Sequence, residues 1–510
     1  MSDILIADSP RYCGSPSYGT MYDTPELGSG AQLYSAFRAT YKNRQRVVYV
    51  GANDGMLHAF DAGTGVTTFD SDGNPIIDAG SGDELWAYVP YEVAGNLSQL
   101  TNPDYQFTPY VDNTPTARDV FYGGRWHTVV VGALRRGGQG IFALDVTNPG
   151  VTESLASSTV LWEFSDDVAV GAGSDPKQLG YTYGKPNISR LANGKWVVVL
   201  PASYNSDETG DGAVGTGLST LFILDIQTGA VLRQFNLTGS KGLTSPTMGD
   251  LQGDFVDEYA VAGDLNGQLW KFDLTSTTPS SWTVAKVFQP AVDGDQPITS
   301  APRLFPDPTT ADLIAVFGTG KYLEPVDRGN SIPQQRLYGL RLGYPGVTLT
   351  LADLQQQTLT KDASNRFRIT SNAIPANKKG WFINLLDAGE RDVTSAGALF
   401  AQGVAIFSTI IPNGNDPCAP SLRGNIYLID ATTGGMPSMG AIVDTNNDGA
   451  VDRLDDATVI GTAVSEAVAE GSPALLIAQG GGSGCLVDYC DIKPPVTVWR
   501  RRSWREIPNE

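Results

Sequence analysis

The stretch VVYVGANDGMLHAFDAGTG, residues 47–65, carries the pattern that decides the fold. An apolar run leads into a Gly-containing turn, and a second run ends at Asp61. Within the second run, LHAFD, apolar positions alternate, which is the period of a strand with one buried face. The stretch therefore predicts two strands joined by a tight turn.

The same module recurs along the chain, and at least six copies are visible. A Pro-containing segment, which we interpret as an entry strand, precedes several of them at Asn113, Gly184, Thr244 and Thr299. A repeated unit of three or four strands buries both its faces only when neighbours stack on it, so the repeats predict the blades of a β-propeller. We expect an all-β fold with seven blades, eight being the alternative. The other copies are VVVGALRRGGQGIFALDV from Val129, GLSTLFILDIQTGAVLRQF from Gly217, YAVAGDLNGQLWKFDL from Tyr259, the pair IAVFGTGKYLE and RLYGLRL between Ile314 and Leu342, and RGNIYLIDATTGG from Arg423.

An Asp ends the second strand of most copies, often in an Asp-x-x-Thr-Gly turn. We expect each carboxylate to cap its turn by accepting backbone N–H bonds, which is a structural role. These residues are Asp61, Asp145, Asp225, Asp273 and Asp430.

Composition limits the partners. The chain has 510 residues, 58 Gly and 31 Pro, and a net charge of −20. This charge repels phosphate backbones and anionic lipid headgroups, so we expect no nucleic-acid partner. No run of 18 apolar residues occurs, so we expect no direct membrane insertion.

The expected location is outside the cytoplasm. No signal-like segment follows Met1, so we interpret the sequence as a piece of a longer exported chain, a cytosolic protein being the alternative. Cys13, Cys418, Cys485 and Cys490 permit two disulfides in any of three pairings, or four free thiols.

The segment DTNNDGAVDRLD, residues 444–455, has the spacing of an EF-hand loop. Oxygen-bearing side chains stand at positions one, three, five, nine and twelve, and Gly449 stands at position six. Calcium takes six to eight oxygen ligands, which this spacing can supply. We predict a calcium site here, an acidic surface turn being the alternative. The predicted ligands are Asp444, Asn446, Asp448, the Ala450 carbonyl, Asp452 and Asp455.

A second candidate calcium loop lies in GDLQGDFVDEYAVAGD, where Phe255 replaces the Gly at position six; a polar turn is the alternative. A third acidic segment, FDSDGNPIID, carries Pro75 at position six and favours a hairpin turn. The second set of ligands is Asp250, Gln252, Asp254, the Val256 carbonyl and Glu258; the third set is Asp70, Asp72, Asn74 and Asp78.

Catalytic motifs are scarce. The chain has two histidines, His58 and His127, and both stand in expected strands, where a satisfied side chain is the favoured interpretation. No GxSxG, HExxH or Walker sequence occurs. The tryptophans at 126, 162, 196 and 270 recur near strands, so we expect them in the core.

Several blocks together resemble the C-terminal domain of the PilC/PilY family of type IV pilus tip adhesins and biogenesis factors. They are GANDGMLHAFDA, ELWAYVP, TPTARDVFYGGRWHTVVVGALRRGGQGIFALDV, AVAGDLNGQLWKFDL and the terminal RRRSWRE. The resemblance extends from about Arg46 to Glu510. It implies a modified, quinoprotein-like seven-bladed propeller with loop insertions, over residues 46–510. Residues 1–45 would pack on or close this propeller, and an insertion at about 437–472 would carry the Asp444 loop. The residues of this insertion by themselves predict an amphipathic helix around Leu454 to Val468.

The resemblance also implies a function. It suggests a non-enzymatic, calcium-binding propeller, exported through the periplasm to the pilus tip or bacterial surface. Its partners would be minor pilins and other pilus-tip subunits, with a host-cell or surface ligand as a further partner. In the family, a calcium loop that opposes pilus retraction falls at Asp250 to Glu258, where Gln252, Phe255 and Glu258 depart from the usual pattern. The function would include pilus assembly, adhesion and twitching motility.

Two enzyme classes are the alternatives. Quinone-dependent dehydrogenases share the AFDAxTG motif, but they stack the quinone on a disulfide of adjacent cysteines, and no two cysteines adjoin here. A carbohydrate-processing propeller is the other, although no carboxylate pair stands out.

Overall fold

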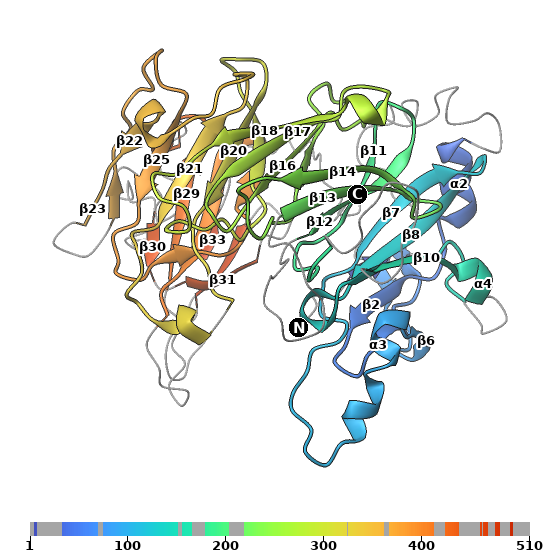
Figure 1. Ribbon diagram of the computed structural model, residues 1–510. Helices are drawn as coiled ribbons and strands as arrows, with labels where there is room; N and C mark the ends of the chain where they lie inside the picture. The colour runs from blue at the N-terminus through green and yellow to red at the C-terminus, as the bar shows by residue number, and fades with distance from the viewer. Residues whose placement is uncertain are drawn as a thin grey trace. The chain divides into compact units, whose positions relative to one another are not determined.

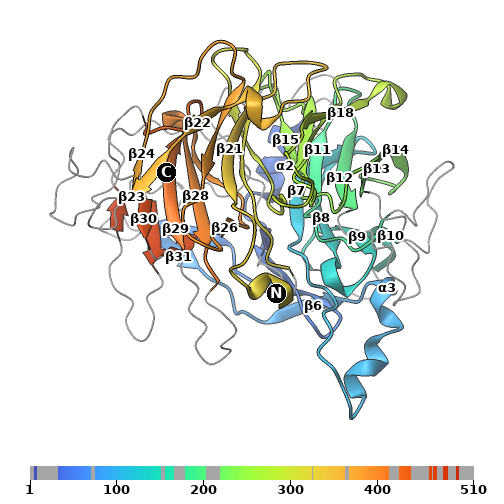
Figure 2. The ribbon, with the colours of Figure 1, turned by 60° about the vertical axis from the view of Figure 1, so that its left-hand side comes forward.

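Strands dominate the protein, a computed structural model of which is shown in Figures 1 and 2. The all-β prediction is confirmed. The structure describes residues 5–7, 33–69, 75–150, 156–165, 179–202, 219–323, 325–361, 367–412, 424–437, 459–461, 463–467, 475–479 and 490–492.

The stretch VVYVGANDGMLHAFDAGTG forms a pair of antiparallel strands, β2 (Val47–Gly51) and β3 (Leu57–Asp61). Their register runs from Val47 opposite Asp61 to Gly51 opposite Leu57. In β3, Leu57 and Ala59 are buried while the residues between them are partly exposed. The predicted alternation is therefore confirmed, because alternate side chains of a strand point to opposite faces of the sheet.

The other repeats form similar antiparallel sheets, and the four Pro-containing segments lead into outer strands of four of them. The first four sheets, in pairing order, are β1 (Leu5–Ala7), β2, β3 and β6 (Glu84–Tyr88); β10 (Val160–Ser165), β9 (Gly140–Asp145), β8 (Arg125–Ala133) and β7 (Thr116–Tyr122); β11 (Asn187–Arg190), β12 (Trp196–Ala202), β13 (Ser219–Asp225) and β14 (Val231–Leu237); and β15 (Thr247–Gly249), β16 (Tyr259–Gly263), β17 (Leu269–Asp273) and β18 (Thr283–Phe288).

The later sheets follow the same plan with additions, among them the strand β22, which pairs in parallel with β25. They are β19 (Arg303–Pro306), β20 (Leu313–Gly318), β21 (Arg336–Arg341), β25 (Gly380–Asn384) and β22 (Gln355–Gln357); β26 (Arg391–Asp392), β28 (Val404–Ile410), β29 (Asn425–Asp430) and β30 (Val459–Gly461), with β27 (Gly397–Leu399) also on β28; and β31 (Ala463–Ala467), β32 (Leu475–Gln479) and β33 (Cys490–Ile492). Two hairpins are β4 (Gly65–Phe69) with β5 (Pro75–Asp78), and β23 (Leu359–Lys361) with β24 (Phe367–Ile369). The number of blades stays a prediction.

Helices are few and short in the described part of the chain. The α-helices are α2 (Tyr34–Tyr41), α3 (Tyr91–Ala94) and α4 (Ala156–Thr159). The 3-10 helices are η4 (Leu97–Thr101), η5 (Arg135–Gly137), η8 (Pro279–Ser281), η9 (Pro325–Arg328), η10 (Leu351–Asp353) and η11 (Phe400–Gln402).

The expected helix around Leu454 to Val468 is wrong, because β30 and β31 lie in this stretch. Strand β30 pairs with β29, Gly461 lying opposite Asn425. The sequence TVIGTAV is rich in β-branched residues, which favour strands when a partner strand is available. Tertiary pairing thus prevailed over the apparent helical period.

The contacts divide the chain into two compact units. Unit 1 comprises Met1–Tyr259 and Asp273–Thr283, and unit 2 comprises Ala260–Phe272 and Val284–Glu510. In unit 1, one core cluster contains Trp126, Trp162 and Trp196. A second cluster in unit 1 gathers around Tyr49 and Phe142. These three tryptophans and Trp270 are at most 7% exposed, which confirms them as core residues.

Helix α2 packs on the first of these clusters. Tyr34 and Phe37 are buried, and the Tyr34 ring centroid lies 4.6 Å from that of Trp126 on β8. In unit 2, the core contains Trp381, Phe407 and Tyr427. Both units thus bury aromatic side chains between sheets, as stacked sheets require.

The carboxylates that end the repeated strands cap their turns, as predicted. Each accepts a hydrogen bond from a backbone N–H two residues further along the chain. These pairs are Asp61 with Gly63 (2.9 Å), Asp145 with Thr147 (3.0 Å), Asp225 with Gln227 (3.1 Å), Asp273 with Thr275 (3.0 Å) and Asp430 with Thr432 (2.9 Å).

Candidate metal site

The candidate site is the loop of residues 250–258, which connects β15 to β16. Asp250 directly follows β15, and Glu258 directly precedes β16. The N–H of Glu258 donates to the carbonyl of Gly249 over 2.9 Å, which closes the base of the loop. Residues eight positions apart are thereby brought to the same place.

Three carboxylates converge inside this loop. One oxygen from each of Asp250, Asp254 and Glu258 lies within 4.8 Å of the other two. Glu258 is buried, Asp250 is half-buried and Asp254 is exposed. The cluster therefore has a protected floor and an open side through which an ion could enter.

Backbone N–H groups hold the loop around Asp250. Its Oδ1 accepts from Gly253 (2.5 Å) and Asp254 (3.1 Å), and its Oδ2 accepts from Phe255 (3.0 Å). Further along, Asp254 Oδ1 accepts from the N–H of Val256 over 2.9 Å. A short loop wound about its first carboxylate in this way is an Asx-type turn extended by two residues.

Phe255 occupies the left-handed backbone region, with φ +65°. Calcium loops of the EF-hand type place Gly at this position because the chain turns sharply there. A bulky side chain in this region costs about 1–2 kcal/mol. The Phe255 ring packs against the core cluster of Trp126 and Trp196, and this contact offsets the strain.

The neighbourhood of the loop is strongly acidic. Burial raises the pKa of Glu258, and the nearby charges of Asp250, Asp254 and Asp257 raise it further. Burial also raises the pKa of Asp257 to about 6, against the opposing effects of Arg118 and Ser189. Such crowding of carboxylates disfavours their charged forms, and a bound cation reverses this.

The residues present fit a hard cation. Carboxylates are the ligands that calcium and magnesium prefer, and the cluster contains neither a thiolate nor an imidazole. The Gln252 amide and the Val256 carbonyl belong to the same loop and could complete the oxygen set. Calcium tolerates irregular geometry better than magnesium does, so it suits a loop of mixed ligands.

The sequence did not identify the surroundings of Asp257. Its N–H donates to the carbonyl of Arg190 over 2.9 Å, and its carboxylate accepts a hydrogen bond from the Ser189 hydroxyl. Arg118 Nη1 lies 4.0 Å from Asp257 Oδ2. These partners come from β7 and β11, so no local sequence signal could have revealed them.

The predicted ligands from Asp444 to Asp455 lie outside the described residues, and their site stays a prediction. In the third acidic segment, Asp78 lies on β5, which forms the predicted hairpin with β4. Its Oδ2 accepts from the N–H of Thr64 and its Oδ1 from that of Gly80, both over 3.0 Å. Asp78 is thus committed to the base of the hairpin, and Asp70, Asp72 and Asn74 lie outside the described residues.

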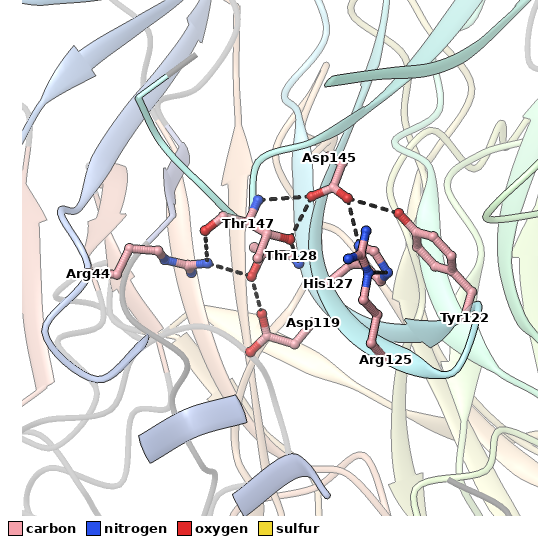
Figure 3. Close-up of polar contacts among 8 residues, drawn as sticks. All are labelled: Arg44, Asp119, Tyr122, Arg125, His127, Thr128, Asp145 and Thr147. Carbon is pink, nitrogen blue, oxygen red and sulfur yellow. Dashed lines mark hydrogen bonds and ion pairs between the residues drawn. The ribbon is translucent and has the colours of Figure 1, made fainter. Parts of the chain in front are cut away.

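His127 is a satisfied side chain, as the sequence predicted. Its Nδ1 lies 2.6 Å from Asp145 Oδ2, and Arg125 Nε donates to its Nε2 over 3.2 Å (Figure 3). Because Nε2 accepts, the proton lies on Nδ1. The ring stacks on Tyr122 with centroids 3.7 Å apart, and Tyr122 donates to the same Asp145 oxygen over 3.0 Å.

A second buried polar group lies beside it. Arg44 Nη1 donates to Thr128 Oγ1 over 2.7 Å, and Thr128 in turn donates to Asp119 Oδ1 over 2.6 Å (Figure 3). The Tyr34 hydroxyl donates to Asp119 Oδ2 over 2.9 Å. Burial raises the pKa of Asp119, whereas the charge of Arg44 and the hydrogen bonds from Thr128 and Tyr34 act to lower it. Each polar group of this network is hydrogen-bonded to another. The network therefore holds the segment around α2 on the sheet, and we assign it a structural role.

His58 lies between two carboxylates. Its Nε2 is 2.8 Å from Asp54 Oδ2, and its Nδ1 is 2.7 Å from Glu84 Oε1. Burial alone lowers the pKa of His58, but the hydrogen bonds to Glu84 and Asp54 outweigh burial and raise it above its usual value. His58 is therefore a partly buried side chain of β3 with both ring nitrogens paired, which confirms the prediction of a satisfied side chain.

Comparison with known proteins gives the family. The family model of the PilY1 beta-propeller domain matches residues 1–372. The chain belongs to this PilY1 family. Over 99% of its length it is 35% identical to the type IV pilus biogenesis factor PilY1 of Pseudomonas aeruginosa PAO1, of which it covers 45%. It is 32% identical to a PilY1 homolog of Xylella fastidiosa, covering 99% of this chain and 39% of that protein.

A solved relative extends the comparison to structure. The crystal structure of the Pseudomonas aeruginosa PilY1 C-terminal domain matches with a TM-score of 0.69 and 30% identity, covering 96% of this chain and 99% of that one. The β-propeller fold and the expected family are thereby confirmed. The chain spans less than half the length of the curated PilY1 relatives it matches. In the described part of this PilY1-family chain, no helix is long and apolar enough to cross a membrane.

Proposed function

We propose that this PilY1-family propeller is a non-enzymatic, calcium-binding part of a type IV pilus biogenesis factor. The observation that carries the calcium proposal is the convergence of Asp250, Asp254 and Glu258 within 4.8 Å. The names of the relatives, all type IV pilus biogenesis factors or homologs, support the pilus role. The protein acts outside the cytoplasm, at the pilus tip or bacterial surface.

In this proposal Asp250, Asp254 and Glu258 hold the ion with charged oxygens, and Gln252 and the Val256 carbonyl add neutral ones. The bound ion neutralises the repulsion within the loop. It thereby stiffens the connection between β15 and β16, and the stiffened propeller docks on minor pilins and other pilus-tip subunits. Docking supports pilus assembly, opposes retraction, and allows adhesion to host-cell or other surfaces and twitching motility. The Asp444 loop is a second calcium site in the same proposal.

Calcium titration by calorimetry tests the proposal. Asp254→Asn removes one charged ligand without touching the core, and we expect it to weaken binding at least about tenfold, or about 1.4 kcal/mol. Asp83→Asn, which changes an exposed acid outside both calcium loops, is the matched control and should leave the isotherm unchanged. Asp448→Ala isolates the Asp444 loop, so that the stoichiometry falls by one site if both bind.

The proposed role in the pilus is tested separately, in cells. Cells that carry Asp254→Asn should retract their pili more readily and twitch differently from cells with the Asp83→Asn control. Unchanged calcium binding in the Asp254→Asn variant would remove the proposed site. Unchanged pilus behaviour despite lost binding would separate calcium from the pilus role.

A further inference from the structure

A second feature of unit 1, unrelated to the metal loop, is the segment of residues 89–110 between β6 and β7. It includes α3 and η4 and projects away from the neighbouring sheets (Figures 1 and 2). Of the eleven exposed large apolar side chains in the described part of the chain, five lie in this segment. They are Val89 (37% exposed), Tyr91 (75%), Leu100 (37%), Tyr105 (37%) and Phe107 (73%).

Buried side chains and hydrogen bonds hold the segment of residues 89–110 against the rest of unit 1. Val93 and Tyr110 are almost completely buried, and the Tyr110 hydroxyl donates to the Asn96 carbonyl over 3.1 Å. The side chain of Leu97 lies over Gly55, where a Cβ would meet it at 2.2 Å. Glu163 accepts from the N–H of Tyr91 over 3.0 Å. The exposed rings are therefore presented by an ordered loop.

The polar side chains of the segment are largely occupied within it. Thr101 Oγ1 donates to the Ser98 carbonyl, and Thr108 Oγ1 donates to the Gln106 carbonyl. The Asn102 side chain accepts from the N–H of Asp104 and donates to Gln99. The solvent-exposed surface of the segment is therefore chiefly aromatic and aliphatic. Such a surface suits an apolar partner better than a sugar.

The charges of the segment and of the whole chain indicate which class of partner it binds. Residues 89–110 contain no Lys or Arg, and their charged residues, Glu92 and Asp104, are both acidic. Binding to an anionic membrane needs basic side chains, and the net charge of −20 opposes both a membrane and a second copy of this chain. Tyr and Phe exposed on a rigid loop, with few charges, are the composition of protein interface centres.

We propose that the segment of residues 89–110 is a docking surface for another protein, one that presents an uncharged apolar pocket with a basic rim. Tyr91 and Phe107 are the anchors that enter this pocket. The basic rim of the partner faces the acidic surface of this chain. This surface does not depend on calcium binding or on the pilus role.

The test uses full-length protein in its own cells, with the photoreactive residue p-benzoylphenylalanine in place of Phe107. A parallel strain carries it in place of Val292, which is 56% exposed and lies outside the segment. The partner cross-linked only through position 107 is then purified and titrated against the purified protein. We expect Tyr91→Ala and Phe107→Ala each to weaken this binding at least about tenfold, and Val292→Ala to leave it unchanged.

Three outcomes overturn the proposal. One is a cross-link to lipid, glycan or a second copy of the chain. Another is the absence of any adduct specific to position 107. The third is reconstituted binding that both alanine variants leave intact while their thermal unfolding matches that of the wild type.

Discussion

The backbone N–H of Phe255 donates to Oδ2 of Asp250 over 3.0 Å, while Phe255 itself adopts a φ of +65°. A residue that is unsuited to the turn is thus held in it by the carboxylate at the start of the loop. The loop around the proposed ligands is shaped by this hydrogen bond and by the packing of the Phe255 ring on the core. We therefore expect the loop to keep its form without calcium.

In the calcium-free protein, prepared with a chelator, the loss of Asp250 should lower the free energy of unfolding more than the loss of Asp254. Asp250→Ala loses hydrogen bonds to three backbone N–H groups, and we expect it to lower the free energy of unfolding by about 1–3 kcal/mol. Both changes relieve the repulsion that raises the pKa of Glu258, but Asp254→Ala loses only one such bond, so its effect should be under about 1 kcal/mol. Urea denaturation measures both, and equal losses would contradict the different roles.

At position 255, Gly should be better tolerated than Ala. Both variants lose the ring contacts with the core, but Phe255→Ala keeps a Cβ at φ +65° whereas Phe255→Gly does not. We expect Phe255→Gly to be more stable than Phe255→Ala by about 1 kcal/mol. Denaturant titration of the two variants side by side checks this order. A Gly variant that is less stable than the Ala variant would show that the φ value is not a strain on the wild type.

Removal of an Asp carboxylate that caps a turn should destabilise the protein more where the carboxylate accepts more hydrogen bonds. Asp430 Oδ1 accepts from the backbone N–H groups and the hydroxyls of Thr432 and Thr433. Within the described part of the chain, Asp273 accepts from the N–H and hydroxyl of Thr275, at an exposed turn. We expect Asp430→Ala to destabilise the protein by about 1–2 kcal/mol and Asp273→Ala by less than about 1 kcal/mol. Thermal unfolding compares them, and the reverse order would contradict the assignment.

The ion pairs of His58 should make stability depend on pH. The folded pKa of His58 is raised by its bonds to Glu84 and Asp54, so its stabilising contribution is complete below the unfolded pKa of about 6.5. The contribution is lost as the pH rises through the higher folded pKa. Because both carboxylates are almost half exposed, we expect less than about 1 kcal/mol.

Thermal unfolding of the wild type and of His58→Gln, measured from pH 5.5 to 8.5, tests this dependence. The advantage of the wild type should shrink toward high pH. A difference between the two proteins that stays constant over this range would mean that His58 does not change its charge there. An NMR titration of the imidazole gives the folded pKa directly.

The sequence by itself determined the strands, the turns and the spacing of the loop acids. The period of two along LHAFD and the Asp at the end of each repeat act over a few residues, so local chemistry was sufficient to place β3 and the cap at Asp61. The convergence of Asp250, Asp254 and Glu258 in one loop follows from the same kind of short-range spacing, and calcium binding there stays a prediction.

Only the tertiary structure decided what surrounds these elements. Ser189 and Arg118 reach Asp257 from strands that are distant in the sequence, and the pairing with β29 made a strand of the residues around Val459. Whether an aromatic ring is buried, as at Tyr110, or exposed, as at Phe107, likewise depends on which sheet lies beneath it. Burial and long-range pairing are properties of the assembled chain, because the free energy of a side chain depends on neighbours that its own segment does not contain.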